Sequence, residues 1–224
     1  MKIDILTLFP QMFDGFLKES IIGRAINNKQ VIINIHDIRT YSKDKHHKVD
    51  DYGIGGGQGM VLMPQPIFSA VEALKQKDST VILLTPQGVP YKQKLAYSLA
   101  KQKHLIIICG HYEGFDERIR TLADMEISIG DFILTGGELA SMVLADSITR
   151  LLDGVIVKES HLQESFNNNL LDYPVYTKPL NFKGLEVPTV LLSGHHENIN
   201  KWRYEESLKR TKIRRPDLLG DDIK

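Results

Sequence analysis

The fold class of this chain is decided by the stretch Leu-Ile-Ile-Ile-Cys at residues 105–109 and by the Gly-His-Tyr-Glu-Gly that follows it at 110–114. Five apolar residues in a row predict a strand that is buried on both faces, as in a parallel sheet covered by helices on both sides. A glycine after such a strand lets the backbone turn sharply and approach a ligand closely. The stretch therefore predicts an α/β fold with a small-molecule site at the carboxyl edge of its sheet.

Strand-like and helix-like segments alternate around this stretch. Strands are expected at 3–9, 31–38, 81–84, 105–109 and 125–129, and helices at 13–26, 66–75, 91–101, 115–122 and 138–152. This alternation predicts βαβ units and a mainly parallel sheet. Residues 41–58 are polar, basic and rich in glycine, so we expect a long loop there.

The character of the chain changes after Val157. We expect a catalytic domain over 1–157, a polar interdomain linker over 158–169, and a small, mostly helical domain over 170–224 with a helix at 197–212. Between Lys201 and Arg215 there are seven basic residues and two acids. That excess suits contacts with phosphates, and it equally suits a solvated helix face near a chain end.

Composition narrows the compartment and the partners. The chain has 28 basic and 28 acidic residues, so its net charge favours no particular partner. The single cysteine, Cys109, lies in an apolar run and is expected in the core, which fits a reducing compartment. No segment approaches the ~20 apolar residues that cross a bilayer, and Asp4 interrupts the N-terminal apolar run. We expect a cytoplasmic protein with no membrane partner.

Several sequence patterns are weaker than they look. The glycines at 55–59 follow Val-Asp-Asp-Tyr at 49–52 and are followed by Pro64 and Pro66, which argues against a Rossmann cradle. There is no Walker A pattern either. The pairs His46–His47 and His195–His196 lack a third ligand at useful spacing, so no metal site is expected.

Acidic residues near the glycine loops are better candidates for function. Asp116 is expected to cap a helix, whereas Glu113, between Tyr112 and Gly114, is expected to face a ligand. Arg150 could form an exposed ion pair with Asp146 four residues earlier, but the apolar character of its helix favours an interface or a site.

Long motifs in a characteristic order carry a resemblance to a known family. The chain resembles the bacterial tRNA (guanine-N1)-methyltransferases of the TrmD family, in the knotted SPOUT superfamily, over essentially its whole length. The matching segments are Ile-Leu-Thr-Leu-Phe-Pro at 5–10, Val-Asp-Asp at 49–51, the glycine run at 55–60, Leu-Thr-Pro-Gln-Gly at 84–88, Cys-Gly-His-Tyr-Glu-Gly at 109–114, and residues 128–138, 146–150 and 190–194.

The resemblance implies a deep trefoil knot in the N-terminal domain and an obligate homodimer with shared active sites. It also implies S-adenosyl-L-methionine as the methyl donor and leaves a Mg²⁺ requirement open. The cofactor-binding positions carried over are Leu84, Thr85, Pro86, Gly88, Gly110, Tyr112, Glu113, Gly114, Ile129, Gly130, Asp131, Phe132, Ile133, Leu134, Gly136 and Gly137.

The implied reaction methylates N1 of the guanosine at tRNA position 37, just 3′ of the anticodon. The catalytic positions carried over are Glu164 as the base, Arg150 and Glu113. The family has aspartate where this chain has Glu164, and arginine, tyrosine and proline are common at His111, Phe132 and Ala140. A catalytically weakened member that binds cofactor and RNA, or an enzyme acting on a small molecule instead of RNA, are the alternatives.

Overall fold

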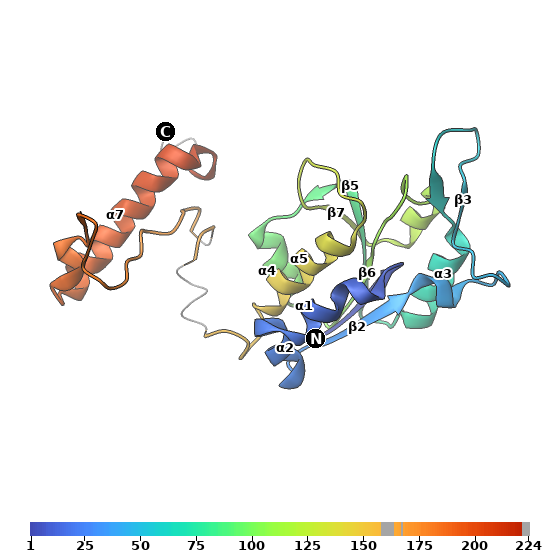
Figure 1. The fold of residues 1–224 in the computed structure, drawn as a ribbon, viewed down its shortest axis with the longest axis horizontal. Coiled ribbons are helices and arrows are strands. Elements are labelled where there is room, and N and C mark those ends of the chain that lie inside the picture. Colours follow the sequence, from blue (N-terminus) through green and yellow to red (C-terminus); the bar gives the residue numbers. More distant parts are fainter. Residues whose placement is uncertain (158–163, 167, 221–224) are drawn as a thin grey trace. The chain divides into compact units, whose positions relative to one another are not determined.

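The computed structural model describes residues 1–157, 164–166 and 168–220, and it divides into two compact units, Met1–Ile156 and Val157–Lys224 (Figure 1). Much of the expected linker, residues 158–163 and 167, lies outside the described residues.

The first unit is built on a parallel sheet. Its strand order is β2-β1-β6-β5-β7, and every neighbouring pair is parallel. Ile107 in β6 lies beside Ile5 in β1 and Ile82 in β5, so the predicted central strand occupies the middle of the sheet. The strands are β1 (Lys2–Thr7), β2 (Ile32–Asp37), β5 (Ser79–Pro90), β6 (His104–Ile108) and β7 (Met125–Ser128). The predicted α/β class is confirmed.

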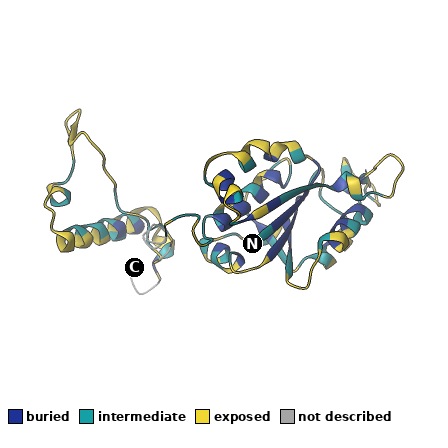
Figure 2. Cartoon of the chain, turned by 90° about the horizontal axis from the view of Figure 1, so that it is seen from below, coloured by how far each residue is buried: buried dark blue, intermediate teal, exposed yellow. Residues whose placement is uncertain are grey.

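Alternate residues of β6 explain why both faces of the sheet are covered. Leu105 and Ile107, with Cys109 just after the strand, belong to one buried cluster, whereas Ile106 and Ile108 belong to another. Figure 2 shows that the strands of the sheet are mostly buried. The first cluster packs under α1 (Asp14–Lys18), α2 (Ser20–Asn27), α4 (Gln93–Leu99) and α5 (Glu138–Thr149). The second packs under α3 (Pro64–Leu74) and the 3₁₀ helices η2 (Ile38–Tyr41) and η3 (Glu117–Leu122). Cys109 is 1% exposed, which confirms its place in the core.

The helix expected at 13–26 is divided. A 3₁₀ helix, η1 (Pro10–Phe13), leads into α1, and Glu19 is extended (φ −105°, ψ 160°) before α2 begins. Gly23 explains the tight junction, because a Cβ there would lie 2.3 Å from the Lys18 carbonyl oxygen. Helical spacing of apolar residues predicted the buried face but could not reveal this close backbone approach.

The expectation of one long loop over 41–58 is wrong in part. Strand β3 (Asp50–Tyr52) forms an antiparallel hairpin with β4 (Met60–Leu62). Gly55, Gly56, Gly57 and Gly59 in the connecting turn all have positive φ angles, which glycine adopts at little cost. The glycine run therefore serves a hairpin turn.

The second unit consists of a long helix with short elements around it. The helix, α7 (His196–Arg214), spans the expected helix at 197–212. A short hairpin and two 3₁₀ helices complete the unit. The hairpin has two strands of two residues each, β8 (Asn181–Phe182) and β9 (Leu185–Glu186), and the 3₁₀ helices are η4 (Thr189–Leu192) and η5 (Pro216–Leu218). Among the described residues of the whole chain, no helix has the length and apolar character required to span a membrane.

Candidate functional site

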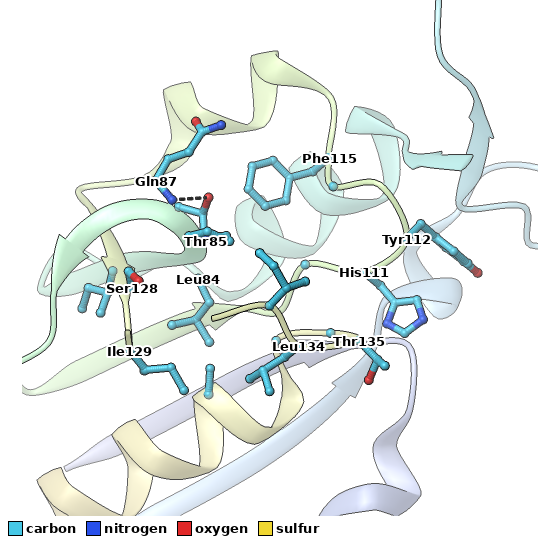
Figure 3. Close-up of a pocket in the computed structure, with 18 of the residues that line it drawn as sticks. Leu84, Thr85, Gln87, His111, Tyr112, Phe115, Ser128, Ile129, Leu134 and Thr135 are labelled. Atoms are coloured by element: carbon cyan, nitrogen blue, oxygen red, sulfur yellow. Dashed lines mark hydrogen bonds between the residues drawn. The ribbon is translucent and has the colours of Figure 1, made fainter. Parts of the chain in front are cut away.

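The loops that leave β5, β6 and β7 enclose a cavity of about 540 Å³ at the carboxyl edge of the sheet (Figure 3). Small-molecule sites in proteins have volumes of about 300–1,000 Å³. In Figure 3, Leu84, Ile129 and Leu134 gather on one side, and His111 lies near Thr135. The cavity is lined by Leu84, Thr85, Pro86, Gln87, Gly110, His111, Tyr112, Glu113, Gly114, Phe115, Glu117, Arg120, Ile127, Ser128, Ile129, Gly130, Phe132, Ile133, Leu134, Thr135, Gly136, Gly137 and Ala140.

The first wall comes from a bulge in β5. Pairing with β7 shifts register between Leu84 and Val89, so residues 85–88 leave the ladder, and Thr85, Pro86 and Gln87 line the cavity. The Thr85 hydroxyl accepts the Gln87 N–H at 3.3 Å and shapes the turn. A Cβ on Gly88 would lie 2.4 Å from the Ile127 nitrogen. Gly88 therefore permits close packing of β5 on β7 and does not line the cavity.

The second wall follows β6. The Glu113 N–H donates to the Met60 carbonyl at 3.0 Å, and the Leu62 N–H donates to the Gly114 carbonyl at 3.0 Å, so the β3–β4 hairpin docks on this loop. A Cβ on Gly59 would lie 2.5 Å from Glu113 Cγ. The glycine hairpin therefore packs directly on the Glu113 side chain, which lines the cavity.

The third wall is the segment between β7 and α5. Gly137 donates its N–H to the Gly110 carbonyl at 2.8 Å, and Gly136 forms an isolated antiparallel bridge with His111. A Cβ on Gly137 would lie 2.7 Å from the Cys109 Cα, so only glycine allows the segment to cross the end of β6 at this distance. Asp131 in the same segment is exposed and does not line the cavity.

The charges around the cavity do not favour a phosphate. Its lining contains the carboxylates of Glu113 and Glu117 and one guanidinium, that of Arg120. Arg120 is already paired with Glu126 and Glu117, and these carboxylates raise its pKa. Arg120 also lies over the Phe115 ring, 5.5 Å from its centroid. The described lining thus offers no unpaired guanidinium or ammonium group, and it suits a neutral or cationic ligand.

One polar atom of the lining is left without a partner. His111 Nδ1 is buried and makes no hydrogen bond within the described structure. Its ring lies 4.8 Å, between centroids, from the rings of both Phe9 and Tyr112. A buried polar atom without a partner is costly, so this nitrogen is a candidate contact for a ligand.

The structure brings together most of the predicted site and separates two catalytic candidates from it. All predicted cofactor-binding residues except Gly88 and Asp131 line the cavity. Arg150 is the C-cap residue of α5, whereas Gly137 is its N-cap residue at the cavity wall. At the α-helical rise of ~1.5 Å per residue, Arg150 lies roughly 20 Å from that wall within the same chain. Asp116 caps η3 by accepting the Arg118 N–H at 2.9 Å, which confirms its structural role.

Glu164 lies in the second unit, beside a cavity of about 210 Å³. Asp172 lines the same cavity, and its pKa is raised by burial and by the nearby charge of Glu164. Arg203 stacks over the Tyr173 ring, 4.8 Å from its centroid, and its Nε is buried without a partner in the described part of the chain. Glu164 is thus grouped with a second carboxylate, an arginine and an aromatic ring.

Sequence reasoning missed several lining residues. Gln87, Ser128 and Thr135 lie within the motifs at 84–88 and 128–138 that were already singled out, so their place in those motifs was an available signal. Phe115, Glu117 and Arg120 come from η3 and its approach, and no local pattern marked them. Among the described residues, no group of three or more His, Cys, Asp or Glu side chains could hold a metal ion.

A parallel sheet with helices on both faces and a glycine-walled cavity at its carboxyl edge defines an α/β protein of the class that binds a small molecule where the strands end.

Similarity to known proteins identifies the family. The family model described as tRNA (Guanine-1)-methyltransferase TrmD matches residues 1–221, and the chain belongs to this family. A tRNA (guanine-N(1)-)-methyltransferase of Halalkalibacterium halodurans is 57% identical over 224 residues, covering 98% of this chain and 91% of the relative. The Bacillus subtilis enzyme of that name is 56% identical, covering 99% and 93%. The Ureaplasma parvum enzyme is 57% identical, covering 97% and 96%.

Proposed function

We propose that this tRNA (guanine-N1)-methyltransferase uses S-adenosylmethionine to methylate N1 of the guanosine at tRNA position 37. The observation that carries the cofactor assignment is the cavity at the carboxyl edge, whose walls are glycine turns and whose one guanidinium is already paired. Glycine turns expose backbone N–H and C=O groups that can read an adenine base without a phosphate cradle.

The chemistry of the lining fits this donor. When bound, S-adenosylmethionine supplies a methyl group on a positively charged sulfur and leaves as a neutral thioether. The Glu113 carboxylate lines the cavity and would favour that positive charge. His111 Nδ1 is a buried polar atom without a partner, and Leu84, Ile129 and Leu134 provide apolar surface for a purine. These residues, together with the glycines of the three walls, would hold the donor.

The chain's acid–base groups have separate tasks in this reaction. Guanine N1 carries a proton at neutral pH, so a base must take that proton as the N1–methyl bond forms. Glu164 is the proposed base, and Arg150 is proposed to steady the substrate or the transition state as guanine N1 loses its proton. The grouping of Glu164 with Asp172, Arg203 and Tyr173 supports a site for a polar planar ligand in the second unit.

The placement of Arg150 supports a homodimer with shared active sites. One α-helix separates Arg150 from the cavity wall of its own chain by roughly 20 Å. We therefore propose that the Arg150 acting at one cavity is supplied by a second copy of the chain. We include in the proposal a deep trefoil knot, supported by the close crossing of Gly137 over Cys109 and Gly110.

The basic helix α7 is the proposed tRNA contact. Its described residues include Lys201, Lys209, Arg210, Lys212 and Arg214. If about five phosphates are contacted, the logarithm of the affinity should fall with the logarithm of salt with a slope of roughly −4. A salt-independent affinity would instead favour the small-molecule alternative. The proposed setting is the cytoplasm, where tRNA is the substrate.

The test is methylation by the full-length chain of two tRNA transcripts that differ only at position 37. With guanosine there, incubation with S-adenosylmethionine should yield 1-methylguanosine, and with adenosine no product should form. Parallel reactions with Mg²⁺ and with a chelator determine whether the ion is required. Absence of product from the guanosine transcript, with folded protein that binds both ligands, would contradict the proposal.

The glutamate at position 164 motivates a second candidate, a family member with weakened turnover. Glutamate is longer than aspartate by one methylene, and a displacement of about 1 Å can impair a preorganised site. Under this alternative, Glu164→Asp raises kcat strongly while both ligand affinities stay constant. Under the leading proposal, kcat stays equal or falls.

A further inference from the structure

We propose that Thr7 and Glu138 are positioning residues for the cofactor cavity, although neither side chain lines it. The proposal rests on binding of S-adenosylmethionine in that cavity. Thr7 is fully buried, Glu138 is 3% exposed, and Thr7 Oγ1 donates a hydrogen bond of 2.7 Å to Glu138 Oε1. The pair connects the end of β1 to the first residue of α5, which lie 131 positions apart in the sequence.

The same threonine hydroxyl also fixes a ring that supports the cavity. Thr7 Oγ1 accepts the Phe9 N–H at 2.9 Å. The Phe9 ring lies 4.8 Å from the His111 ring, between centroids, with 56° between their planes. His111 lines the cavity. One hydroxyl therefore orders both the Glu138 carboxylate and the backbone that carries Phe9 against His111.

The other carboxylate oxygen supports the third wall from behind. A Cβ on Gly136 would lie 2.3 Å from Glu138 Oε2 and 2.6 Å from His111 Nδ1. The Glu138 carboxylate and the His111 ring therefore converge on Gly136, which lines the cavity together with Gly137. Gly137 is itself hydrogen-bonded to Gly110 at 2.8 Å. Movement of Glu138 would shift this wall relative to the end of β6.

Packing alone gives a poor account of this carboxylate. Among the described residues, Glu138 forms no ion pair with a lysine or arginine, and Thr7 provides its side-chain hydrogen bond. The start of α5 favours a negative charge. Even so, burial of a carboxylate is costly, and an apolar residue would serve packing better. A requirement for a fixed wall beside the ligand explains the arrangement.

The test compares Thr7→Val and Thr7→Ser in the full-length protein. Thr7→Val keeps the shape but removes the hydroxyl, and we expect the Kd and KM for S-adenosylmethionine to rise about tenfold, equivalent to ~1.4 kcal/mol. Thr7→Ser keeps the hydroxyl and should stay within about twofold of wild type. The KM for tRNA should not change in either variant. Glu138→Gln provides a second variant, with an expected rise in the cofactor KM alone.

Val31→Ala is the matched control for lost stability. Val31 is 1% exposed and directly precedes β2, so it lies at the amino ends of the strands, away from the cavity at their carboxyl ends. Its truncation should destabilise the fold without changing cofactor affinity. The positioning role is overturned if wild type binds S-adenosylmethionine and Thr7→Val binds it equally well, or if Val31→Ala weakens binding as much. Failure of the wild type to bind the cofactor overturns the proposed function, and the positioning role with it.

Discussion

The two edges of the parallel sheet differ in how completely their buried polar groups are hydrogen-bonded. Near the amino ends of the strands, the fully buried carboxylate of Asp4 accepts hydrogen bonds from Lys2, Asn34, His36 and His104 at 2.6–3.1 Å. At the carboxyl ends, glycine turns surround a cavity, and His111 Nδ1 has no hydrogen-bond partner among the described residues. Satisfied polar groups specify and stabilise a fold, whereas unsatisfied ones are available to a ligand.

The Asp4 cluster is a chain of hydrogen bonds that leads away from the carboxylate in two directions. On one side, His36 Nδ1 lies 3.1 Å from the Tyr41 hydroxyl, and on the other His104 Nδ1 lies 2.7 Å from Ser79 Oγ. It joins β1, β2, β5, β6 and η2. The walls of the cavity are held by backbone hydrogen bonds and close glycine contacts, by the hydrogen bonds of Arg120 to Gln87, Glu117 and Glu126, and by the Thr7–Glu138 pair. We therefore expect substitutions at the first edge to change stability and those at the second to change binding.

The largest effect is expected for Glu164, which lies at neither edge of the sheet. Glu164→Gln removes the proposed base while keeping its size, and kcat should fall by about 10²–10⁴-fold. Cofactor affinity and the free energy of unfolding of the first unit should stay unchanged, because the residue lies outside that unit. Single-turnover methylation measures the rate, and calorimetry measures the affinity. A variant with wild-type kcat would show that another group removes the proton.

The next effect tests the closed edge. Asp4→Ala leaves several buried donors without an acceptor, and the free energy of unfolding should fall by about 3 kcal/mol. Urea denaturation measures this loss, while calorimetry should show unchanged cofactor affinity. The matched control is Asp78→Ala, which removes an exposed ion pair with Lys103 and should leave stability unchanged. Equal stabilities of the two variants would remove the distinction between the edges.

A smaller effect tests the open edge. Gly137→Ala places a Cβ 2.7 Å from the Cys109 Cα and 2.9 Å from the Gly110 nitrogen, so the wall must shift. We expect a stability loss of about 2 kcal/mol and a cofactor affinity that falls about thirtyfold, because glycine turns form the wall. Gly15→Ala is the control, since nothing lies within 4 Å of its added Cβ. Unchanged affinity in Gly137→Ala would show that this wall does not contact the ligand.

The smallest effect is a pH dependence of stability. Burial by itself raises the pKa of Asp4, but hydrogen bonds from His36, Lys2, Asn34 and His104 bring it well below its ordinary value. A carboxyl group whose pKa is lower in the folded state stabilises the fold above its unfolded pKa of ~3.9 and loses that contribution as pH falls further. When the pH is lowered from 4 to 3, the free energy of unfolding of Asp4→Asn should therefore fall by about 1 kcal/mol less than that of the wild type. Urea denaturation at each pH measures this difference. If the free energies of unfolding of the two proteins fall in parallel with pH, the lowered pKa of Asp4 is contradicted.

The sequence predicted the elements better than their junctions. Apolar runs such as 105–109 identified the strands because a doubly covered strand has no polar face. The break at Glu19 and the β3–β4 hairpin were missed, because both depend on glycines that accept a close backbone approach or a positive φ angle. Such contacts involve residues that are distant or conformations that leave no periodic pattern.

The candidate site divides in the same way. Glycine loops after strands indicated Gly110, Gly136 and Gly137, because parallel strands deliver their carboxyl ends to a common edge. The sequence did not indicate that Arg120 would join this cavity.

The sequence by itself determined the α/β class, the central strand, the location of the glycine loops and the membership of a methyltransferase family. Only the tertiary structure decided that Gly88 permits the close packing of two strands, that Thr7 is hydrogen-bonded to Glu138, and that Asp4 accepts hydrogen bonds from several donors. The physical reason is the distance along the sequence over which each kind of interaction acts. Burial patterns and turn preferences act over a few neighbouring residues, whereas these contacts join positions that only the folded sheet brings within hydrogen-bonding distance.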